Sequence, residues 1–346
     1  MPYQHRLRSI FDLVRKSGDI QAESTTPTSR LPSHFTWLSG PPLIAPKNDS
    51  RNLAALKDPS IVFYEGAWHL FASTAHATNG YNLVYLTFTS WDEAGSVEHH
   101  YLDQSAIGTG YRAAPQIFYF APQKLWYLVF QDGNAGYSTN PDVADPNGWS
   151  AVKHFHVDMP QIIRDHIGNG YWLDFWVICD EVHCHLFSSD DNGQLYRSWT
   201  PVGSFPEGFN DPVIAMQDAD RWRLFEACNV YRYDGRYLLL VEAIGTDERR
   251  WFRSWTSDRI EGPWEALAAE EDHSFARANN VEFEGGVRWT EDISHGELIR
   301  SGVDEKLEIN PCDLVYVYQG MRPDATGEYN SLPWRLALIT QTNSEC

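Results

Sequence analysis

A repeated pattern of paired strands runs through this chain and limits the folds that it can form. Four stretches each hold an apolar or aromatic strand, a short polar turn and a second strand rich in Trp, Tyr, Leu and Val; they begin at Leu56, Ala114, Leu173 and Phe225. The last two continue into a further strand that ends in Tyr-Arg-Ser-Trp-Thr or Phe-Arg-Ser-Trp-Thr. The repeating unit is therefore larger than a hairpin.

The spacing of these units is typical of one architecture. Their first strands begin near Asp58, Pro115, Asp174, Glu226 and Asp292, roughly 50 to 65 residues apart. Multi-stranded repeats of about this length are how β-propeller blades appear in a sequence. No helical pattern competes with them after the N-terminal segment. The pattern predicts an all-β fold, a five-bladed β-propeller, as one domain over residues 31–346.

Residues 1–30 differ from the rest of the chain. Apolar residues recur there at helical spacing, at Leu7, Ile10, Phe11 and Val14, and the segment ends in the linker-like sequence QAESTTPTSR. We therefore predict an N-terminal helix and linker. Asp12 and Arg15 interrupt the apolar core that a secretory signal would need. No stretch of the chain approaches the roughly 18 apolar residues of a membrane-spanning helix.

Composition narrows the class of ligand. The formal net charge of -20 repels nucleic acid and anionic membranes, so neither is expected as a partner. Aromatic residues make up 14% of the chain. Such an excess in an acidic protein fits the recognition of neutral sugars, whose C–H faces stack on aromatic rings. The alternative is that most of these rings are core and strand residues.

The five cysteines show no paired spacing of a zinc site. Cys179 and Cys184 lie on either side of a predicted turn, where they could close a disulfide or serve as small buried residues. The sequence indicates no pairing for Cys228, Cys312 and Cys346.

The predicted fold brings three acids together. The first strand of a propeller blade usually lies innermost, so residues at equivalent places in different blades meet near the axis. Asp58, Asp174 and Glu226 occupy equivalent places in the first, third and fourth repeats. Hydrolysis of a glycosidic bond requires one acid to protonate the leaving oxygen and one carboxylate to activate water or attack carbon. The alternative is a set of turn acids, since Asp58 precedes a proline.

Several motifs resemble one enzyme family. They are LKDPS from Leu56, LFEACNVY from Leu224, VEAIG from Val241, WTEDISHGELIR from Trp289, NPCDL from Asn310 and YNSLPWRLALIT from Tyr329. In this order they resemble glycoside hydrolase family 62, the α-L-arabinofuranosidases, from about Leu31 to the C-terminus. The resemblance implies an extracellular, inverting enzyme that removes L-arabinofuranose side groups from arabinoxylan or arabinan.

The resemblance also implies roles for the three acids. Asp58 matches the general base that activates water, and Glu226 matches the general acid. Asp174 matches the acid that tunes and orients the donor. In an inverting enzyme the carboxyl groups of Asp58 and Glu226 should lie about 6.5 to 9.5 Å apart, to leave room for water.

Further positions follow from the same resemblance. Lys57 and Tyr329 match residues that line the arabinose pocket, and we also expect Gln131 in the substrate-binding cleft. Arg335 is expected close by, although it could equally be a structural ion-pair partner. His295 matches the position that holds a calcium ion in the central channel; from its chemistry alone it would be a buried hydrogen-bonding residue, since calcium prefers oxygen ligands. Two residues later, Glu297 is expected to pair with a nearby cation.

The chain also departs from the family pattern. Many members carry Gln-Trp-Gly in the second blade, where this chain has Gln131-Asp132-Gly133, and the missing ring removes a stacking surface from the cleft. Glu261-Gly-Pro resembles the proton-donor motif of the related family 43, but we interpret it as a turn.

Two rival functions are a family 43 type of propeller glycosidase and a sugar-binding propeller without turnover. A closed propeller has no obligatory exposed edge, so a monomer is expected.

Overall fold

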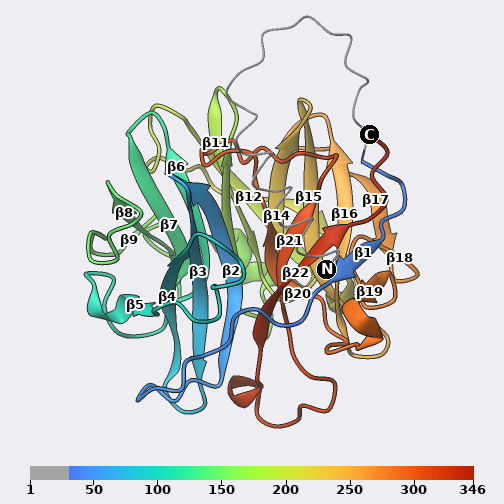
Figure 1. The fold of residues 1–346 in the computed structure, drawn as a ribbon. Helices are drawn as coiled ribbons and strands as arrows, with labels where there is room; N and C mark the ends of the chain where they lie inside the picture. The colour runs from blue at the N-terminus through green and yellow to red at the C-terminus, as the bar shows by residue number, and fades with distance from the viewer. Residues whose placement is uncertain (1–30) are drawn as a thin grey trace, which may run out of the picture.

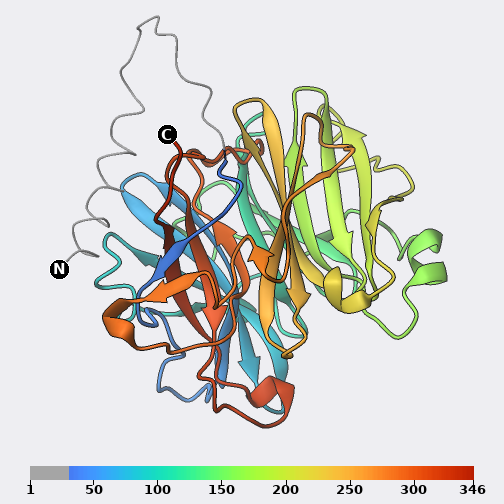
Figure 2. The same ribbon diagram turned by 90° about the vertical axis from the view of Figure 1, so that its right-hand side faces the viewer.

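The computed structural model describes residues 31–346, which form five β-sheets arranged around a central axis (Figures 1 and 2). The predicted all-β, five-bladed propeller is confirmed. The helix and linker predicted for residues 1–30 lie outside the described residues.

The first three blades are four-stranded antiparallel sheets, and each follows the chain outward from the axis. Blade one holds β2 (Ala55–Tyr64), β3 (Ala67–His76), β4 (Gly80–Phe88) and β5 (His100–Tyr101). Blade two holds β6 (Ala113–Phe120), β7 (Leu125–Gln131), β8 (Ala135–Asn140) and β9 (Lys153–His154). Blade three holds β10 (Leu173–Cys179), β11 (His183–Ser189), β12 (Gln194–Pro201) and β13 (Val213–Gln217).

The last two blades are five-stranded. Blade four holds β14 (Glu226–Tyr233), β15 (Arg236–Ile244), β16 (Arg250–Ser257), β17 (Glu265–Glu270) and β18 (His273–Ser274). Blade five has the order β19 (Val281–Phe283), β1 (Trp37–Ser39), β22 (Arg335–Gln341), β21 (Val315–Gly320) and β20 (Ser294–Leu298). The early strand β1, blue in Figure 1, thus pairs with the last strand β22, red in the same view, and closes the ring.

Short helices interrupt the loops. A six-residue helix, α2 (Gln161–His166), precedes blade three and was not expected from the sequence, because one turn and a half is too short to produce a helical period. The remaining helices are 3-10 turns: η1 (Leu102–Gln104), η2 (Arg221–Arg223), η3 (Glu284–Gly286) and η4 (Tyr329–Ser331). Within residues 31–346, no helix is long and apolar enough to cross a membrane.

The core lies between the blades, and it contains many of the aromatic residues. Trp37, Trp68, Trp126 and Trp334 are each at most 2% exposed. These four rings are therefore core residues, and their burial excludes a role in stacking on a sugar. Near the axis, the fully buried carboxylate of Glu297 pairs with Arg300 at 2.7 Å and accepts a hydrogen bond from the N–H of Ile61 at 2.9 Å, so it has the cationic partner that was expected.

The described residues contain two disulfide bonds. Cys179 and Cys184 bridge the hairpin between β10 and β11, one of the two alternatives that the sequence left open. Cys312 is linked to Cys346, near the C-terminus, which the sequence did not indicate. Cys228 is free and buried.

A β-bulge interrupts every inner strand near the same end of the propeller. The pairing register shifts just after Lys57, Ala113, Leu173, Glu226 and Ser294. In four blades the bulge holds a residue with positive φ: Asp58 (49°), Ala114 (48°), Asp174 (54°) and Ala227 (55°). A bulge releases backbone groups from the ladder and re-aims a side chain, so this end of the propeller can present functional groups toward the axis.

Candidate active site

A cavity of about 770 Å³ opens at the bulged ends of the inner strands. Seven of the eight residues predicted for the site line it: Lys57, Asp58, Gln131, Asp174, Glu226, His295 and Tyr329. Arg335 does not. Its guanidinium donates to the backbone carbonyls of Ala54 at 2.9 Å and Trp334 at 2.7 Å, so it supports the wall of the propeller beside the cavity rather than facing a ligand.

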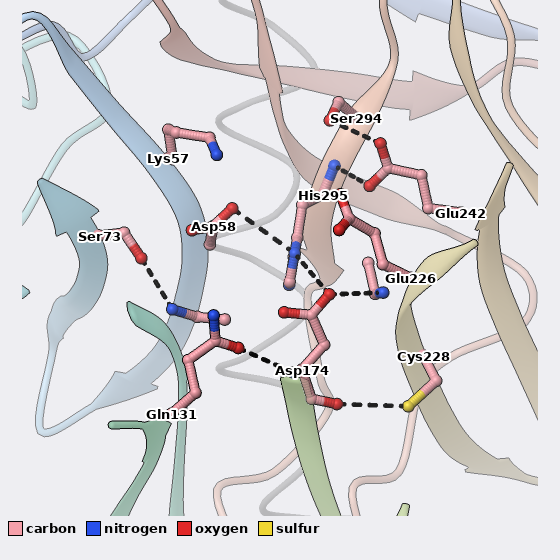
Figure 3. A network of polar contacts seen from close by, with 12 residues as sticks. Lys57, Asp58, Ser73, Gln131, Asp174, Glu226, Cys228, Glu242, Ser294 and His295 are labelled. Carbon is pink, nitrogen blue, oxygen red and sulfur yellow. Dashed lines mark hydrogen bonds and ion pairs between the residues drawn. The ribbon is translucent and has the colours of Figure 1, made fainter. Parts of the chain in front are cut away.

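The N–H groups released by the bulges form a ring of hydrogen bonds around the axis, part of which is seen in Figure 3. Each N–H donates to a side chain of the preceding blade: Asp58 to Gln319 (2.7 Å), Ala114 to Ser73 (2.8 Å), Asp174 to Gln131 (2.8 Å), Ala227 to Asp174 (2.7 Å) and His295 to Glu242 (3.0 Å). Buried N–H groups must be paired. The ring therefore fixes the backbone beneath each residue of the site.

This ring shows that the three predicted acids do not occupy equivalent positions. Ala227, not Glu226, is the counterpart of Asp58 and Asp174, because these three residues hold the left-handed conformation and donate in the ring. Glu226 precedes the bulge residue and corresponds to Lys57 of blade one. The acids still converge on one cavity, but Glu226 does so from a different point of its blade.

Asp58 is buried in a positively charged environment. Its Oδ1 lies 3.5 Å from Nδ1 of His295, and Lys57 is its neighbour in the chain (Figure 3). Burial by itself would raise the pKa of Asp58, but the charges of Lys57 and His295 outweigh it, and the pKa is lowered. Asp58 is therefore a carboxylate, as a group that takes a proton from water must be.

Asp174 lies in the opposite electrostatic situation. Its pKa is raised well above the ordinary value by burial and by the negative charges of Glu226 and Asp58. Its Oδ2 accepts the hydrogen bond from Ala227 and lies 3.7 Å from Nδ1 of His295. One cavity thus holds an acid that favours its charged form and an acid that favours its protonated form.

Glu226 is held by an arginine that the sequence analysis missed. Nη1 of Arg250 pairs with Oε1 of Glu226 and lies 3.1 Å from Oε1 of Glu242. Glu242 has no exposed surface, and burial raises its pKa to about 7 despite the arginine. It also accepts from Oγ of Ser294 at 2.8 Å (Figure 3). Arg250 therefore ties Glu226 to the buried scaffold of blade four.

Lys57 and Tyr329 meet across the cavity wall. Nζ of Lys57 donates to the hydroxyl of Tyr329 at 2.9 Å and lies 4.6 Å from the centre of its ring. Lys57 is buried, whereas Tyr329 is 44% exposed. The phenol can therefore contact a ligand with one face while the ammonium group holds its hydroxyl.

The amide of Gln131 is used by the protein itself. Its Oε1 accepts from the N–H of Asp174, and its Nε2 donates to the hydroxyl of Tyr111 at 2.5 Å. Gln131 lines the cavity as predicted. These contacts make it a residue that positions Asp174.

His295 was expected to hold calcium. In the structure its Nδ1 lies 3.5 Å from Oδ1 of Asp58 and 3.7 Å from Oδ2 of Asp174. Calcium takes six to eight oxygen ligands. The described residues offer here one ring nitrogen and two acids with other partners. Such a donor set fits an imidazole shared between carboxylates and does not make a calcium cage.

A second group with metal-ligand chemistry lies at the opposite end of blade three. One ligand atom each from Asp180, His183 and His185 lies within 4.8 Å of the others. However, Nη1 of Arg197 donates to Nδ1 of His185 at 3.0 Å, which leaves the ring hydrogen on Nε2, the atom that lies 3.8 Å from Asp180. A metal would need the lone pair of that nitrogen, so this group does not form a ready site.

Comparison with known proteins identifies the family. The profile described as Glycosyl hydrolase family 62 matches residues 36–340. The chain belongs to glycosyl hydrolase family 62. It is 43% identical over 318 residues to alpha-L-arabinofuranosidase C of Cellvibrio japonicus (strain Ueda107), a match that covers 90% of this chain but 48% of that protein. The chain thus spans about half the length of this curated relative.

Solved structures of family 62 agree closely with this one. The catalytic domain of a Coprinopsis cinerea GH62 alpha-L-arabinofuranosidase is 65% identical, covers 91% of this chain and is itself covered over its full length (100%), with a TM-score of 0.90. A GH62 hydrolase in complex with xylotriose is 53% identical, covers 89% of this chain and is covered over 98% of its own, with a TM-score of 0.87.

One departure from the family 62 pattern has a structural explanation. Asp132, which stands where many members carry Trp, does not face the cavity. Its carboxylate accepts from Nε2 of His154 at 2.9 Å and from the N–H of Asn134 at 3.2 Å, and Arg112 lies 3.8 Å away. The side chain ties down a loop of blade two. The Glu261 motif lies in an exposed turn after β16, as interpreted from the sequence.

Sequence reasoning missed three charged residues of this family 62 site: Asp191 and Arg250, which line the cavity, and Glu242 behind Arg250. One of them left a signal. Glu242 interrupts the apolar run LLLVEAI in the middle of a predicted strand, where an acid must find a partner. Arg250 lies in DERRWFRSW, where three other charged residues precede it. Nothing in that run distinguishes the arginine that points inward.

Proposed function

We propose that this protein is an inverting α-L-arabinofuranosidase that removes L-arabinofuranosyl side groups from arabinoxylan or arabinan. The observation that carries the proposal is the convergence of Asp58, Asp174 and Glu226 on one cavity, in which the pKa of Asp58 is lowered and the pKa of Asp174 is raised. The Cellvibrio japonicus and Coprinopsis cinerea relatives are both named as α-L-arabinofuranosidases, which supports the choice of sugar.

In this proposal Asp58 and Glu226 act on opposite sides of the bound arabinose. Asp58, held as a carboxylate by Lys57 and His295, takes a proton from a water molecule that attacks the anomeric carbon. Glu226 gives a proton to the glycosidic oxygen as the bond to the leaving sugar breaks. The incoming water and the departing sugar use opposite faces of the ring, so the product has the inverted configuration.

Asp174 and Arg250 position the acid. Asp174 carries no charge in its protonated form, so it can lie beside Glu226 without strong repulsion. Arg250 fixes one oxygen of Glu226 from the side of the buried Glu242. A proton donor held by a fixed arginine keeps its geometry toward the leaving oxygen.

The shape of the site fits the removal of single side groups. The acids lie in a cavity whose wall contains Tyr81, Tyr111, Phe225 and Tyr329. A furanose ring can enter the cavity while the polymer remains outside. Xylan as the backbone is supported by the xylotriose complex of the 53% identical relative.

Three further properties stay predictions: a structural calcium ion at His295 and an extracellular location, which follow from the family resemblance, and a monomeric state, which follows from the closed propeller. The geometry around His295 gives calcium little direct support, so the ion would have to take most of its ligands from water.

Arabinose release from wheat arabinoxylan tests the function, with the configuration of the product followed by proton NMR. We expect β-arabinofuranose as the first product from the wild type, and loss of release in Glu226→Gln. Asp258→Ala is the control, because Asp258 is 83% exposed after β16, far from the cavity. First release of the α-anomer would refute inversion. A protein that binds xylotriose but releases no arabinose from arabinoxylan at any pH would be a sugar-binding propeller without turnover.

A further inference from the structure

A second cavity, of about 660 Å³, lies directly beside the cavity that holds the three acids. Tyr329 and Arg250 line both cavities, and Nη2 of Arg250 donates to the hydroxyl of Tyr329 at 3.5 Å. These two side chains therefore form the wall between the cavities. The rest of the second cavity comes from η2, the turn between β15 and β16, and the chain on both sides of η4. The proposed mechanism gives this second cavity no role.

Exposed aromatic rings are found at both cavities. In the part of the chain that the structure describes, four aromatic side chains are exposed: Tyr111, Tyr171, Trp222 and Tyr329. Tyr111 and Tyr171 line the cavity of the acids, Trp222 lines the second cavity, and Tyr329 lines both. Large exposed apolar groups that gather in one region of a soluble protein mark a binding surface. The two cavities are therefore parts of one surface that binds ligand.

Trp222 is held in place although it is exposed. It lies in η2, and its main-chain N–H donates to Oδ1 of Asp220 at 3.1 Å. The centre of its ring lies 5.4 Å from that of Phe225, and the guanidinium carbon of Arg221 lies 4.7 Å from it. Trp222 is nonetheless 45% exposed. A fixed ring with open surface is suited to stacking on a sugar, because it loses little freedom when the sugar binds.

The charges of the second cavity favour a neutral ligand. Its three arginines pair with acids: Arg223 with Glu270 (2.9 Å), Arg249 with Asp292 (3.4 Å) and Arg250 with Glu226. An anion would have to compete with these acids for the guanidinium groups. A ligand that is uncharged and carries hydroxyl groups can instead use the open ring of Trp222 and the polar rim together.

We propose that the second cavity binds a xylopyranose unit of the polymer backbone, which stacks on Trp222 while the arabinose side group occupies the cavity of the acids. This inference rests on the proposed function, because it takes a polysaccharide as the substrate. The wall of Tyr329 and Arg250 separates the two sugar units, so a substrate that fills only the first cavity does not reach Trp222. Trp222 therefore gives the enzyme a preference for the polymer over a small arabinoside.

Comparison of a polymeric with a small substrate tests the role of Trp222. In Trp222→Ala, kcat/KM for wheat arabinoxylan should fall about tenfold through a higher KM, the loss expected when one ring no longer stacks on a sugar. The kcat/KM for an aryl α-L-arabinofuranoside should stay at the wild-type value. Trp222→Phe, which keeps a smaller ring, should lie between the wild type and Trp222→Ala on arabinoxylan.

Trp199→Ala is the matched control. Trp199 lies on β12 at the opposite end of blade three, where its ring centre is 4.5 Å from that of His183. Its removal should leave kcat/KM for both substrates unchanged.

Binding of xylohexaose, an unbranched fragment of the backbone, measures the same contact without turnover. Its dissociation constant should rise about tenfold in Trp222→Ala. An unchanged kcat/KM for arabinoxylan or an unchanged affinity for xylohexaose would overturn the proposal. Equal losses of kcat/KM on the polymer and on the aryl arabinoside would also overturn it, because Trp222 would then act only by supporting Phe225 beside Glu226. A wild type that hydrolyses no arabinofuranoside would refute the proposed function, and the affinity for xylohexaose would still decide whether Trp222 contacts the backbone.

Discussion

The main-chain N–H of Ala227 donates to the carboxyl group of Asp174 over 2.7 Å. In the other four blades the corresponding N–H meets a side chain from the second strand of the preceding blade: Ser73, Gln131, Glu242 or Gln319. Blade three alone among the five uses its inner-strand acid for this purpose. Asp174 is therefore both part of the ring that closes the propeller and part of the lining of the cavity.

Substitutions of Asp174 should separate these two roles. Because burial and the neighbouring acids raise the pKa of Asp174 and favour its protonated form, Asp174→Asn keeps an uncharged group with an acceptor oxygen, and its free energy of unfolding should stay close to that of the wild type. Asp174→Ala leaves the buried N–H of Ala227 unpaired and should cost about 1 to 3 kcal/mol. Urea denaturation measures both. Arabinose release should fall in both variants, and full activity in Asp174→Asn would show that Glu226 needs no neighbouring acid.

Glu242 should make stability depend on pH. Its folded pKa of about 7 lies above its ordinary value of 4.5, so the stability that it contributes is fully present below pH 4.5 and is lost as the pH rises to about 7. Glu242→Gln removes this loss, which amounts to at most about 3 kcal/mol. The variant should be less stable at pH 4.5, because one amide oxygen replaces the two carboxyl oxygens that accept from Ser294 and His295, and the difference should shrink toward pH 7. The prediction would be contradicted if the melting temperatures of the wild type and of Glu242→Gln differed by the same amount at every pH between 4.5 and 7.

Tyr329→Phe should weaken substrate binding. The change removes the hydroxyl that accepts from Nζ of Lys57 and leaves a buried ammonium group with one partner fewer. We expect kcat/KM for an aryl α-L-arabinofuranoside to fall about tenfold, mainly through KM. Tyr64→Phe, at the far end of β2, is the matched control. A fall in kcat alone would place the hydroxyl in the transition state and not in sugar binding.

Removal of divalent ions tests the calcium prediction at His295. If an ion contributes to the fold, chelation with EGTA should lower the melting temperature, and calcium should restore it, because a ligand that binds only the folded state stabilises it. His295→Ala should then melt at the same temperature with and without EGTA. Metal analysis that finds no calcium in the purified protein, together with unchanged melting, would exclude the ion.

The fold could be predicted from the sequence because its signal repeats. Each blade carries its own apolar strands and polar turns, so five independent copies of one local pattern indicate the same architecture. The first strands predicted near Asp58, Pro115, Asp174 and Glu226 fall within β2, β6, β10 and β14. The short helix α2 and the link between Cys312 and Cys346 could not be predicted, since neither produces a period or depends on neighbouring residues.

The sequence by itself determined which acids the site has available, because the blade pattern and the family motifs single out Asp58, Asp174 and Glu226. Only the tertiary structure decided what each can do. The protonation of an acid depends on burial and on charges from other blades, such as Lys57 and His295 around Asp58. The one-residue offset of Glu226 and the arginine that holds it likewise arise from bulges and contacts between residues far apart in the chain. Such contacts leave no local pattern, because the propeller creates them only when its ring closes.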